Sequence, residues 1–288
     1  MSSPSTSASS DGSYEPEVDP STYYDKLLQQ QPVRHKDYRL FRLGLNNVYI
    51  YTKDIADCPI HVLALLSTVG AFRFSPQPSP ADVVADEQIA DLAVQPFPEV
   101  FVQDIICKRL LPPLAAVLHR SDRVPMLESN VPSSKPAANC GHTVSTPAPD
   151  VLYGYSLERA FRGQDAVHVG GRALADDADM VYPFFLIEFT NECDDMWVAT
   201  NECLGGTATC VNIIEQLKCR LWDKIPHDED EIHNTAVCSL TISPTTALFY
   251  ITWRTWEDTT YTKLIATYPL QDAAHWLCLR QVIQSVLG

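Results

Sequence analysis

Residues 181–189, with the sequence VYPFFLIEF, form a run in which Glu188 is the single charged side chain. A strand with this composition is buried on both faces, so it belongs in the interior of a sheet that is covered by other elements on both sides. Residues 150–155 form a second strand-like run, and three more β-rich runs separated by turn residues lie between residues 237 and 268. The spacing of these three runs predicts a meander.

Helices are predicted before, between and after these strands. Residues 199–221 are a long helix candidate with two adjacent glycines near its start, and Asp272 is placed to cap a closing amphipathic helix. In the first half of the chain, helical patterns occupy residues 37–45, 60–69, 80–94 and 98–111. This order of elements predicts an α+β fold with an α/β core.

Composition divides the chain into a tail and one domain. The first 31 residues combine a tail rich in Ser, Pro and acids, which we expect to be disordered, with a short helix at residues 23–31. Residues 32–288 form the domain. Its parts are a helical region at 32–120, a connector rich in Pro, Ser and Asn at 121–149, and the core at 150–288.

The charge and cysteine content restrict the class of protein. The formal net charge is −15, which argues against a general nucleic-acid binder because such proteins usually present a basic face. The nine cysteines form no Cys-x-x-Cys pair, and the chain starts with no basic segment followed by an apolar one. We therefore expect reduced thiols and an intracellular location, in the cytoplasm or nucleus. No apolar run is long enough to span a bilayer, so no membrane association is expected.

Two carboxylates are predicted to meet at neighbouring strand ends. Asp150 follows Pro149 at the start of one strand, and Glu188 lies near the end of the apolar strand. Such a pair can hold one Mg²⁺, which prefers oxygen ligands and keeps several of its waters. With a cation at residue 190, the site would activate water against a phosphodiester.

Four longer blocks resemble the mostly fungal PD-(D/E)XK nuclease-like proteins. They read PDVLYGYS, VYPFFLIEF, MWVATNECLGGTATCVNI and LQDAAHWLCLRQVI, and the resemblance runs from about residue 37 to the C-terminus. It implies a restriction-endonuclease-like core, a mixed sheet flanked by helices after an N-terminal helical region. It also implies Mg²⁺-dependent hydrolysis of phosphodiesters in DNA.

The resemblance assigns roles by position. Asp150 and Glu188 are the motif carboxylates and the implied metal ligands, and Glu99 matches a helix acid that supports the metal. Thr190 stands where the motif has lysine, and Glu202 stands where the family usually has glutamine.

The missing lysine leaves the activity open. A threonine cannot offer a positive charge to the developing phosphorane, and the loss of one such contact typically lowers the rate about 10²-fold or more. Residues 173–217 contain nine acids and no Lys or Arg, which locally disfavours nucleic acid. The alternatives are an inactive nuclease fold that serves as an interaction or regulatory module for a protein partner, and a metal-binding protein with another substrate.

Substitute cations for the lysine were sought along the sequence. Lys218 lies 16 residues past Glu202, about 24 Å along a helix, and Lys108 and Arg109 lie roughly 14 Å from Glu99. These three are too distant to act at the site. The remaining candidates lie on loops whose course the sequence does not define; they are Arg159, Arg162 and Arg172.

Overall fold

A computed structural model gives the architecture of the chain. It describes residues 32–71, 78–92, 94, 96–132, 144–161, 163, 166, 169, 171–191, 196–221 and 235–288. The tail and short helix expected in residues 1–31 lie outside the described residues.

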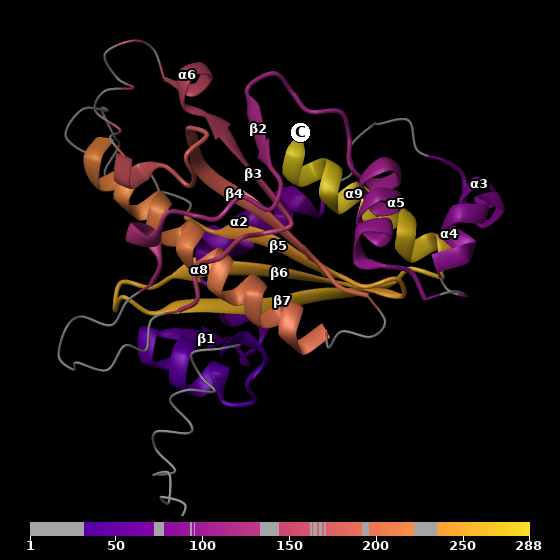
Figure 1. The fold of residues 1–288 in the computed structure, drawn as a ribbon, viewed down its shortest axis with the longest axis horizontal. Coiled ribbons are helices and arrows are strands. Elements are labelled where there is room, and N and C mark those ends of the chain that lie inside the picture. The colour runs from indigo at the N-terminus through magenta and orange to yellow at the C-terminus, as the bar shows by residue number, and fades with distance from the viewer. Residues whose placement is uncertain are drawn as a thin grey trace, which may run out of the picture.

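The described strands form one mixed sheet in the order β1-β7-β6-β5-β4-β3-β2 (Figure 1). The strands are β1 (Val48–Ile50), β2 (Leu118–Ser121), β3 (Val151–Ser156), β4 (Met180–Phe189), β5 (Val237–Ile242), β6 (Thr246–Arg254) and β7 (Thr260–Pro269). β1 runs parallel to β7 and β4 runs parallel to β5, whereas the other neighbours are antiparallel. The predicted apolar strand is central, and the predicted meander is β5–β6–β7.

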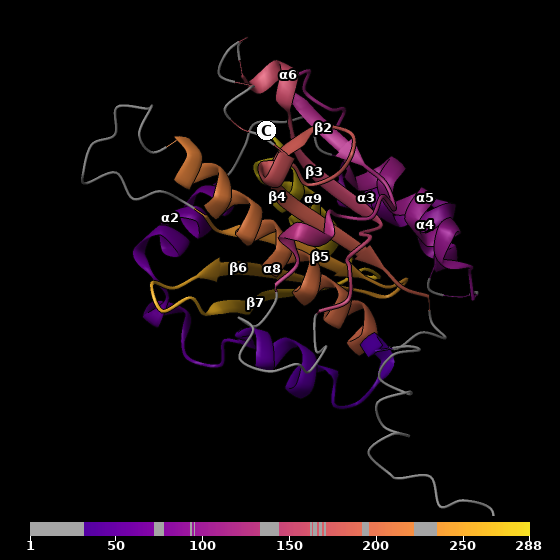
Figure 2. The same ribbon diagram turned by 60° about the vertical axis from the view of Figure 1, so that its left-hand side comes forward.

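Helices flank the sheet on both sides, as Figures 1 and 2 show. The helices are α2 (Ile60–Val69), α3 (Pro80–Ala85), α4 (Glu87–Leu92), α5 (Glu99–Leu110), α6 (Leu157–Ala160), α8 (Met196–Leu221) and α9 (Ala273–Leu287). Helix α8 crosses one face, and α2, α5 and α9 pack on the other face. Short 3₁₀ segments occupy Pro32–Arg34, Gly44–Asn46, Ile55–Asp57, Glu128–Asn130 and Gly171–Ala173, and a π-helix occupies Arg39–Leu43. The predicted α+β class is confirmed.

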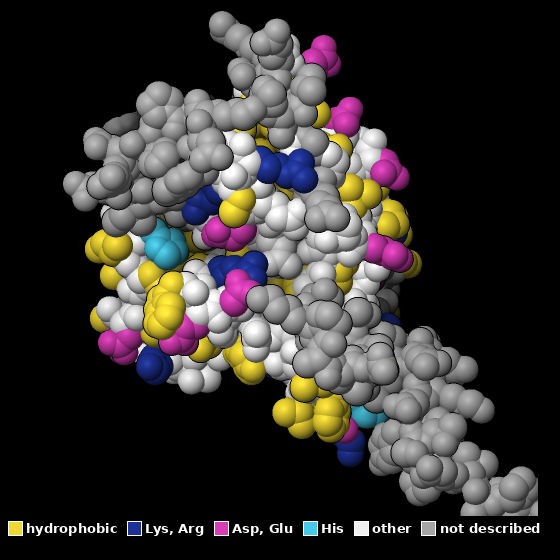
Figure 3. Space-filling view, turned by 90° about the vertical axis from the view of Figure 1, so that its left-hand side faces the viewer, with side chains coloured by type: hydrophobic (Ala, Val, Ile, Leu, Met, Phe, Trp, Pro, Cys, Tyr) yellow, Lys and Arg dark blue, Asp and Glu magenta, His cyan; other side chains and the backbone are white. Residues whose placement is uncertain are grey.

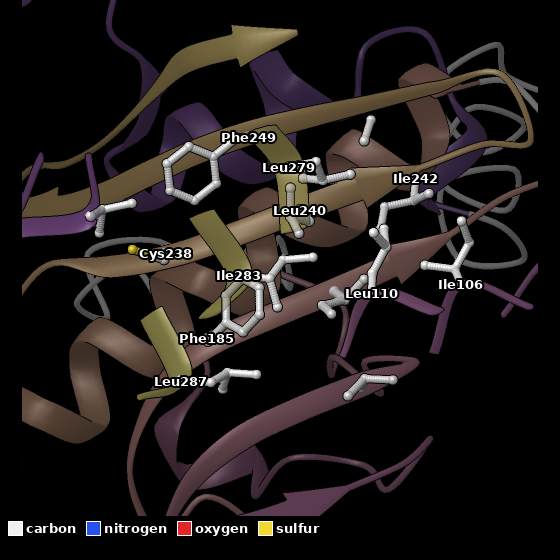
Figure 4. Close-up of a cluster of buried hydrophobic side chains, with 14 of the residues drawn as sticks. Ile106, Leu110, Phe185, Cys238, Leu240, Ile242, Phe249, Leu279, Ile283 and Leu287 are labelled. Atoms are coloured by element: carbon white, nitrogen blue, oxygen red, sulfur yellow. The ribbon is translucent and has the colours of Figure 1, made fainter. Parts of the chain in front are cut away.

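Alternation along β4 divides its side chains between two hydrophobic layers. Phe185, Ile187 and Phe189 join the larger cluster, which β5, β6, α5 and α9 complete (Figure 4). Leu186 points to the opposite layer, against α8. Glu188 has the same parity as Leu186, so it lies on the α8 side of the sheet. A strand buried on both faces therefore carries one carboxylate into the interior.

The first half of the chain differs in places from the sequence-based expectation. The helix expected over 80–94 is divided at Asp86, whose backbone is extended and whose carboxylate accepts hydrogen bonds from the first turn of α4. The first half of the chain, expected to be helical, also supplies the edge strands β1 and β2. Neither strand shows an apolar alternation, because β1 has only three residues, of which Tyr49 and Ile50 are exposed, and β2 has only four, of which three are half-buried.

Among the described helices, none combines the length and the hydrophobicity needed to cross a bilayer.

Candidate functional site

A cavity of about 300 Å³ lies where β4 ends and helices α5 and α8 begin. We call it the carboxylate cavity. Its lining combines acids with apolar and small residues; the residues are Val33, Tyr38, Glu99, Ser145, Thr146, Pro147, Ala148, Asp150, Glu188, Phe189, Glu202 and Gly205. The four acids predicted from the sequence are therefore brought to one place.

The pairing of β3 with β4 positions Asp150 beside Glu188. Val151 is opposite Ile187, so one step further along the antiparallel register puts Asp150 opposite Glu188. The backbone N–H of Asp150 lies 3.4 Å from Glu188 Oε2, and the N–H of Phe189 donates to Asp150 Oδ2 at 2.7 Å. The Asp150 carboxylate is thus held in a fixed orientation at the start of β3, beside the end of β4.

Glu188 is the most deeply buried acid of the cavity, with 5% of its surface exposed. Burial raises its pKa well above the ordinary value, and the charges of Asp150, Glu202 and Glu99 raise it further. The hydrogen bond from the Asp150 N–H acts in the opposite direction. Such surroundings disfavour the charged form of the carboxyl, and a cation that compensates its charge would favour it.

Arg123 supplies the positive charge that the sequence search missed. Its Nε donates to Asp150 Oδ1 at 2.8 Å, and a terminal guanidinium nitrogen donates to Glu99 Oε1 at 2.7 Å. Its partial burial disfavours the charge, but the hydrogen bond to Asp150 and the nearby carboxylates outweigh burial and raise its pKa. The guanidinium therefore bridges two of the predicted metal-binding acids.

The backbone explains how Arg123 reaches this position. β2 pairs with β3 so that Ser121 is opposite Leu152, and two further steps of the same register bring Arg123 opposite Asp150. The N–H of Arg123 donates to the carbonyl of Pro149 at 2.9 Å. Its φ of 55° lies in the left-handed region, which is sparsely populated for residues other than glycine. The connector predicted for residues 121–149 thus begins with the last residue of a strand and carries the missing cation.

Glu202 approaches the cavity from the first turns of α8, which pack on β4. A Cβ atom on Gly206 would lie 2.5 Å from Leu186 Cδ1, so a larger residue here would force the buried Leu186 side chain to shift. Tyr38, from the N-terminal segment, also lines the cavity, where it is buried and packs with Leu204 and Ala208 of α8. Burial raises the Tyr38 pKa, with Arg42 opposing and Glu202 reinforcing the shift.

Thr190 does not line the carboxylate cavity, although it follows Glu188 on the same side of the strand. Its side chain is 2% exposed, and its hydroxyl lies 3.4 Å from the carbonyl of Asn191. Its N–H donates to Ile242 at 2.9 Å, which continues the pairing with β5. In this structure the residue at the lysine position extends the sheet.

The other basic candidates lie away from the acids or outside the described residues. Lys108 pairs with Asp104, and Arg109 pairs with Asp86. Arg159 donates to the carbonyl of Ala116. Arg162 and the side chain of Arg172 lie outside the described residues, as do Cys140, His142 and the run from His227 to His233.

The residues present fit a small divalent cation through Asp150 and Glu188. As the site stands, no group of three or more His, Cys, Asp or Glu side chains within the described residues is arranged to hold a metal ion. Mg²⁺, however, commonly uses one or two carboxylates and keeps its waters for the remaining positions. The fit rests on the buried Glu188 carboxyl, whose charge is opposed by three neighbouring acids and would be compensated by a cation.

Comparison with known proteins identifies a family for most of the chain. Residues 98–287 match the model of a domain of unknown function, DUF7924. The match includes Glu99, Arg123, Asp150, Glu188 and Glu202 and begins after the segment that supplies Tyr38. A comparison with curated proteins gives no match. Because the family match spans more than half of its residues, the chain belongs to the DUF7924 family.

Proposed function

We propose that the carboxylate cavity is the active site of a Mg²⁺-dependent phosphodiester hydrolase that acts on DNA, with Arg123 in the role of the missing motif lysine. The observation that carries this proposal is the convergence of four carboxyl groups and one guanidinium on one cavity, from five separate segments of the chain. This combination supplies both metal ligands and a cation for the phosphate.

Each residue has a role that follows from its position. Asp150 and Glu188 would hold the cation, and Glu99 would contact one of its waters. The bound Mg²⁺ would lower the pKa of a water and offset two of the negative charges. Arg123 would exchange some of its hydrogen bonds to the acids for hydrogen bonds to the phosphate. A guanidinium can donate two parallel hydrogen bonds to two phosphate oxygens. Glu202, at the exposed rim, would accept a hydrogen bond from the attacking water.

A second candidate function is supported by the double hydrogen bond of Arg123. A guanidinium that binds both Asp150 and Glu99 already provides the positive charge that a metal would otherwise bring. In this reading Arg123 substitutes for the metal, the acids are structural, and the fold serves as an interaction module for a protein partner.

Cleavage assays test the first candidate. Full-length protein is incubated with single-stranded and duplex DNA in Mg²⁺ or Mn²⁺, and we expect cleavage that Asp150→Ala abolishes. Asp104→Ala is the matched control, because Asp104 lies on α5 and pairs with Lys108 at the surface. Intact DNA in every condition, with identical behaviour of the wild type and Asp150→Ala, would reject the hydrolase.

Titration calorimetry with Mn²⁺ separates the two candidates independently of activity. If Arg123 serves the phosphate, the wild type binds Mn²⁺ and Arg123→Gln binds at least as tightly, because a competing cation has been removed. If Arg123 replaces the metal, the wild type binds no Mn²⁺ and only Arg123→Gln does. Lys108→Gln, at the far end of α5, controls for a general loss of positive charge.

A further inference from the structure

A second and larger cavity, of about 810 Å³, lies at the other end of α8. We call it the amide cleft. The last turns of α8 form one wall, the segment around Asn130 forms another, and the end of β6 with the β6–β7 turn forms the third. Figure 3 looks onto this end of the molecule. Gln216 lies 14 residues past Glu202, so the two cavities are about 20 Å apart along the helix.

A fixed network of hydrogen bonds orients the polar groups of the amide cleft. Asn212 donates to the carbonyl of Asn130 at 3.2 Å and accepts from Arg254 at 2.7 Å. Gln216 donates to the side-chain oxygen of Asn130 at 3.3 Å. The side-chain amides of Asn212 and Gln216 each have further donor and acceptor positions, so the network holds hydrogen-bond donors and acceptors in fixed orientations in the cleft.

Trp256 lines the same cleft and is 91% exposed. An indole exposed to this degree leaves a large apolar surface in water, and exposed Trp residues are enriched where proteins bind ligands. The ring lies in the turn between the paired strands β6 and β7. Its face is therefore available to another planar group.

The charges around the amide cleft differ from those of the carboxylate cavity. Arg254 pairs with Asp258, and Lys218 pairs with Glu215 at 3.7 Å. Arg220 also lines the cleft, whose lining carries two basic side chains, Arg220 and Arg254, and two acids, Glu215 and Asp258. On the face shown in Figure 3, basic and acidic side chains are interspersed and do not form a single-sign patch. Such a surface tolerates a phosphate without being a general polyanion site.

We propose that the amide cleft binds an unpaired nucleobase of single-stranded nucleic acid, stacked on Trp256 with its edge hydrogen-bonded to Gln216 and Asn212. Stacking on aromatic side chains and bidentate contacts from amide side chains are the usual means of recognising exposed bases. The choice of nucleic acid over another planar ligand rests on the proposed function. At 3.4 Å per stacked nucleotide, the distance between the two cavities corresponds to about six nucleotides.

The test measures binding of a fluorescent single-stranded 15-nucleotide DNA by anisotropy, in EDTA so that no cleavage occurs. Trp256→Ala should weaken binding about tenfold, as expected for the loss of one stacked base. Trp256→Phe should recover part of the affinity, and Glu257→Gln, in the same turn, should bind as the wild type does. In a ¹⁵N correlation spectrum, the indole resonance that is absent from Trp256→Ala should shift when the wild type binds the DNA.

The outcomes distinguish this inference from the proposed function. If Asp150→Ala binds the strand as the wild type does, and no variant cleaves DNA, the hydrolase fails and the nucleobase site stands. If the wild type cleaves DNA while Trp256→Ala binds the strand unchanged, the nucleobase site is overturned. A Trp256 resonance that responds to polar peptides and not to oligonucleotides would also overturn it, in favour of a protein partner.

Discussion

The two ends of helix α8 present opposite chemistry on one continuous helix. At the N-terminal end, Glu202 faces three further acids, and Arg123 is the cation that contacts two of them. At the C-terminal end, amide groups and an exposed indole line a larger cavity in which Arg254 and Asp258 form an ion pair. We propose a metal ion as the ligand of the first end and a neutral planar group as the ligand of the second.

This difference shows why a count of charges over the whole chain misleads. Residues 173–217, which hold the acidic excess that disfavours nucleic acid, contribute two acids to the carboxylate cavity, Glu188 and Glu202, and a divalent cation there would offset part of their charge. The same segment contributes one acid, Glu215, to the amide cleft, whose lining also holds Arg220 and Arg254. A strand could therefore be held by uncharged contacts at one end of α8 and by metal and Arg123 at the other.

The largest effect on cleavage is expected from removing an acid of the carboxylate cavity, with removal of an acid of the amide cleft as the comparison. Glu188→Ala should lower cleavage at least 10²-fold, because it removes a metal ligand. Glu215→Ala, which removes an acid of the amide cleft, should change cleavage by less than about twofold, since surface ion pairs contribute little. Rates of cleavage in Mg²⁺ measure both. Equal losses in the two variants would break the distinction between the ends.

A charge-relocation experiment tests whether Arg123 performs the task of the lysine. Arg123→Ala should reduce the rate of cleavage about 10²-fold. The double variant Arg123→Ala, Thr190→Lys should cleave about tenfold faster than Arg123→Ala, because the cation returns to the motif position. Single-turnover rates at saturating DNA separate this effect from weaker binding. No recovery in the double variant, with folding intact by circular dichroism, would assign Arg123 a structural role.

The close approach of α8 to β4 at the carboxylate cavity can be tested by stability. Gly206→Ala should lower the free energy of unfolding by about 1–2 kcal/mol, because the new methyl group meets the fully buried Leu186 at 2.5 Å and this outweighs the better helix propensity of alanine. Gly171→Ala is the control, since a Cβ there has no neighbour within 4 Å. Urea denaturation compares the two. A stabilised Gly206→Ala would contradict the observed packing.

The smallest effect concerns the pH dependence of stability. The pKa of Glu188 is raised in the folded state, so its contribution is fully present below its ordinary pKa of about 4.5 and is lost as pH rises through the folded pKa. Stability of metal-free protein should therefore decline as pH rises above 4.5. Glu188→Gln should reduce this slope, and Glu215→Gln should retain it. Urea midpoints in EDTA between about pH 5 and pH 8 provide the measurement; identical slopes in all three proteins would refute the shift.

Local patterns were sufficient for the central elements. The apolar composition of residues 181–189 identified β4, and the predicted bounds of α2 agree with the structure. The cap of α9 by Asp272 is also confirmed, because its carboxylate accepts from Ala274 and His275. These features depend on adjacent residues and on the periodicity of apolar residues, and both can be recognised directly from the sequence. The meeting of Asp150 and Glu188 followed from the ends of two such strands.

The partners of these acids depended on contacts that no local pattern encodes. Arg123 reaches Asp150 through the pairing of a four-residue polar edge strand, whose register has no hydrophobic alternation to specify it. The amide cleft brings together segments that are more than 80 residues apart in the sequence, such as those of Asn130 and Asn212. Tyr38 likewise reaches the carboxylate cavity from a distant segment. The sequence by itself determined the layers and the pair of carboxylates, because burial selects them residue by residue. The tertiary structure alone decided which cation meets them and where a second cavity opens, because those positions are set by the packing of whole elements.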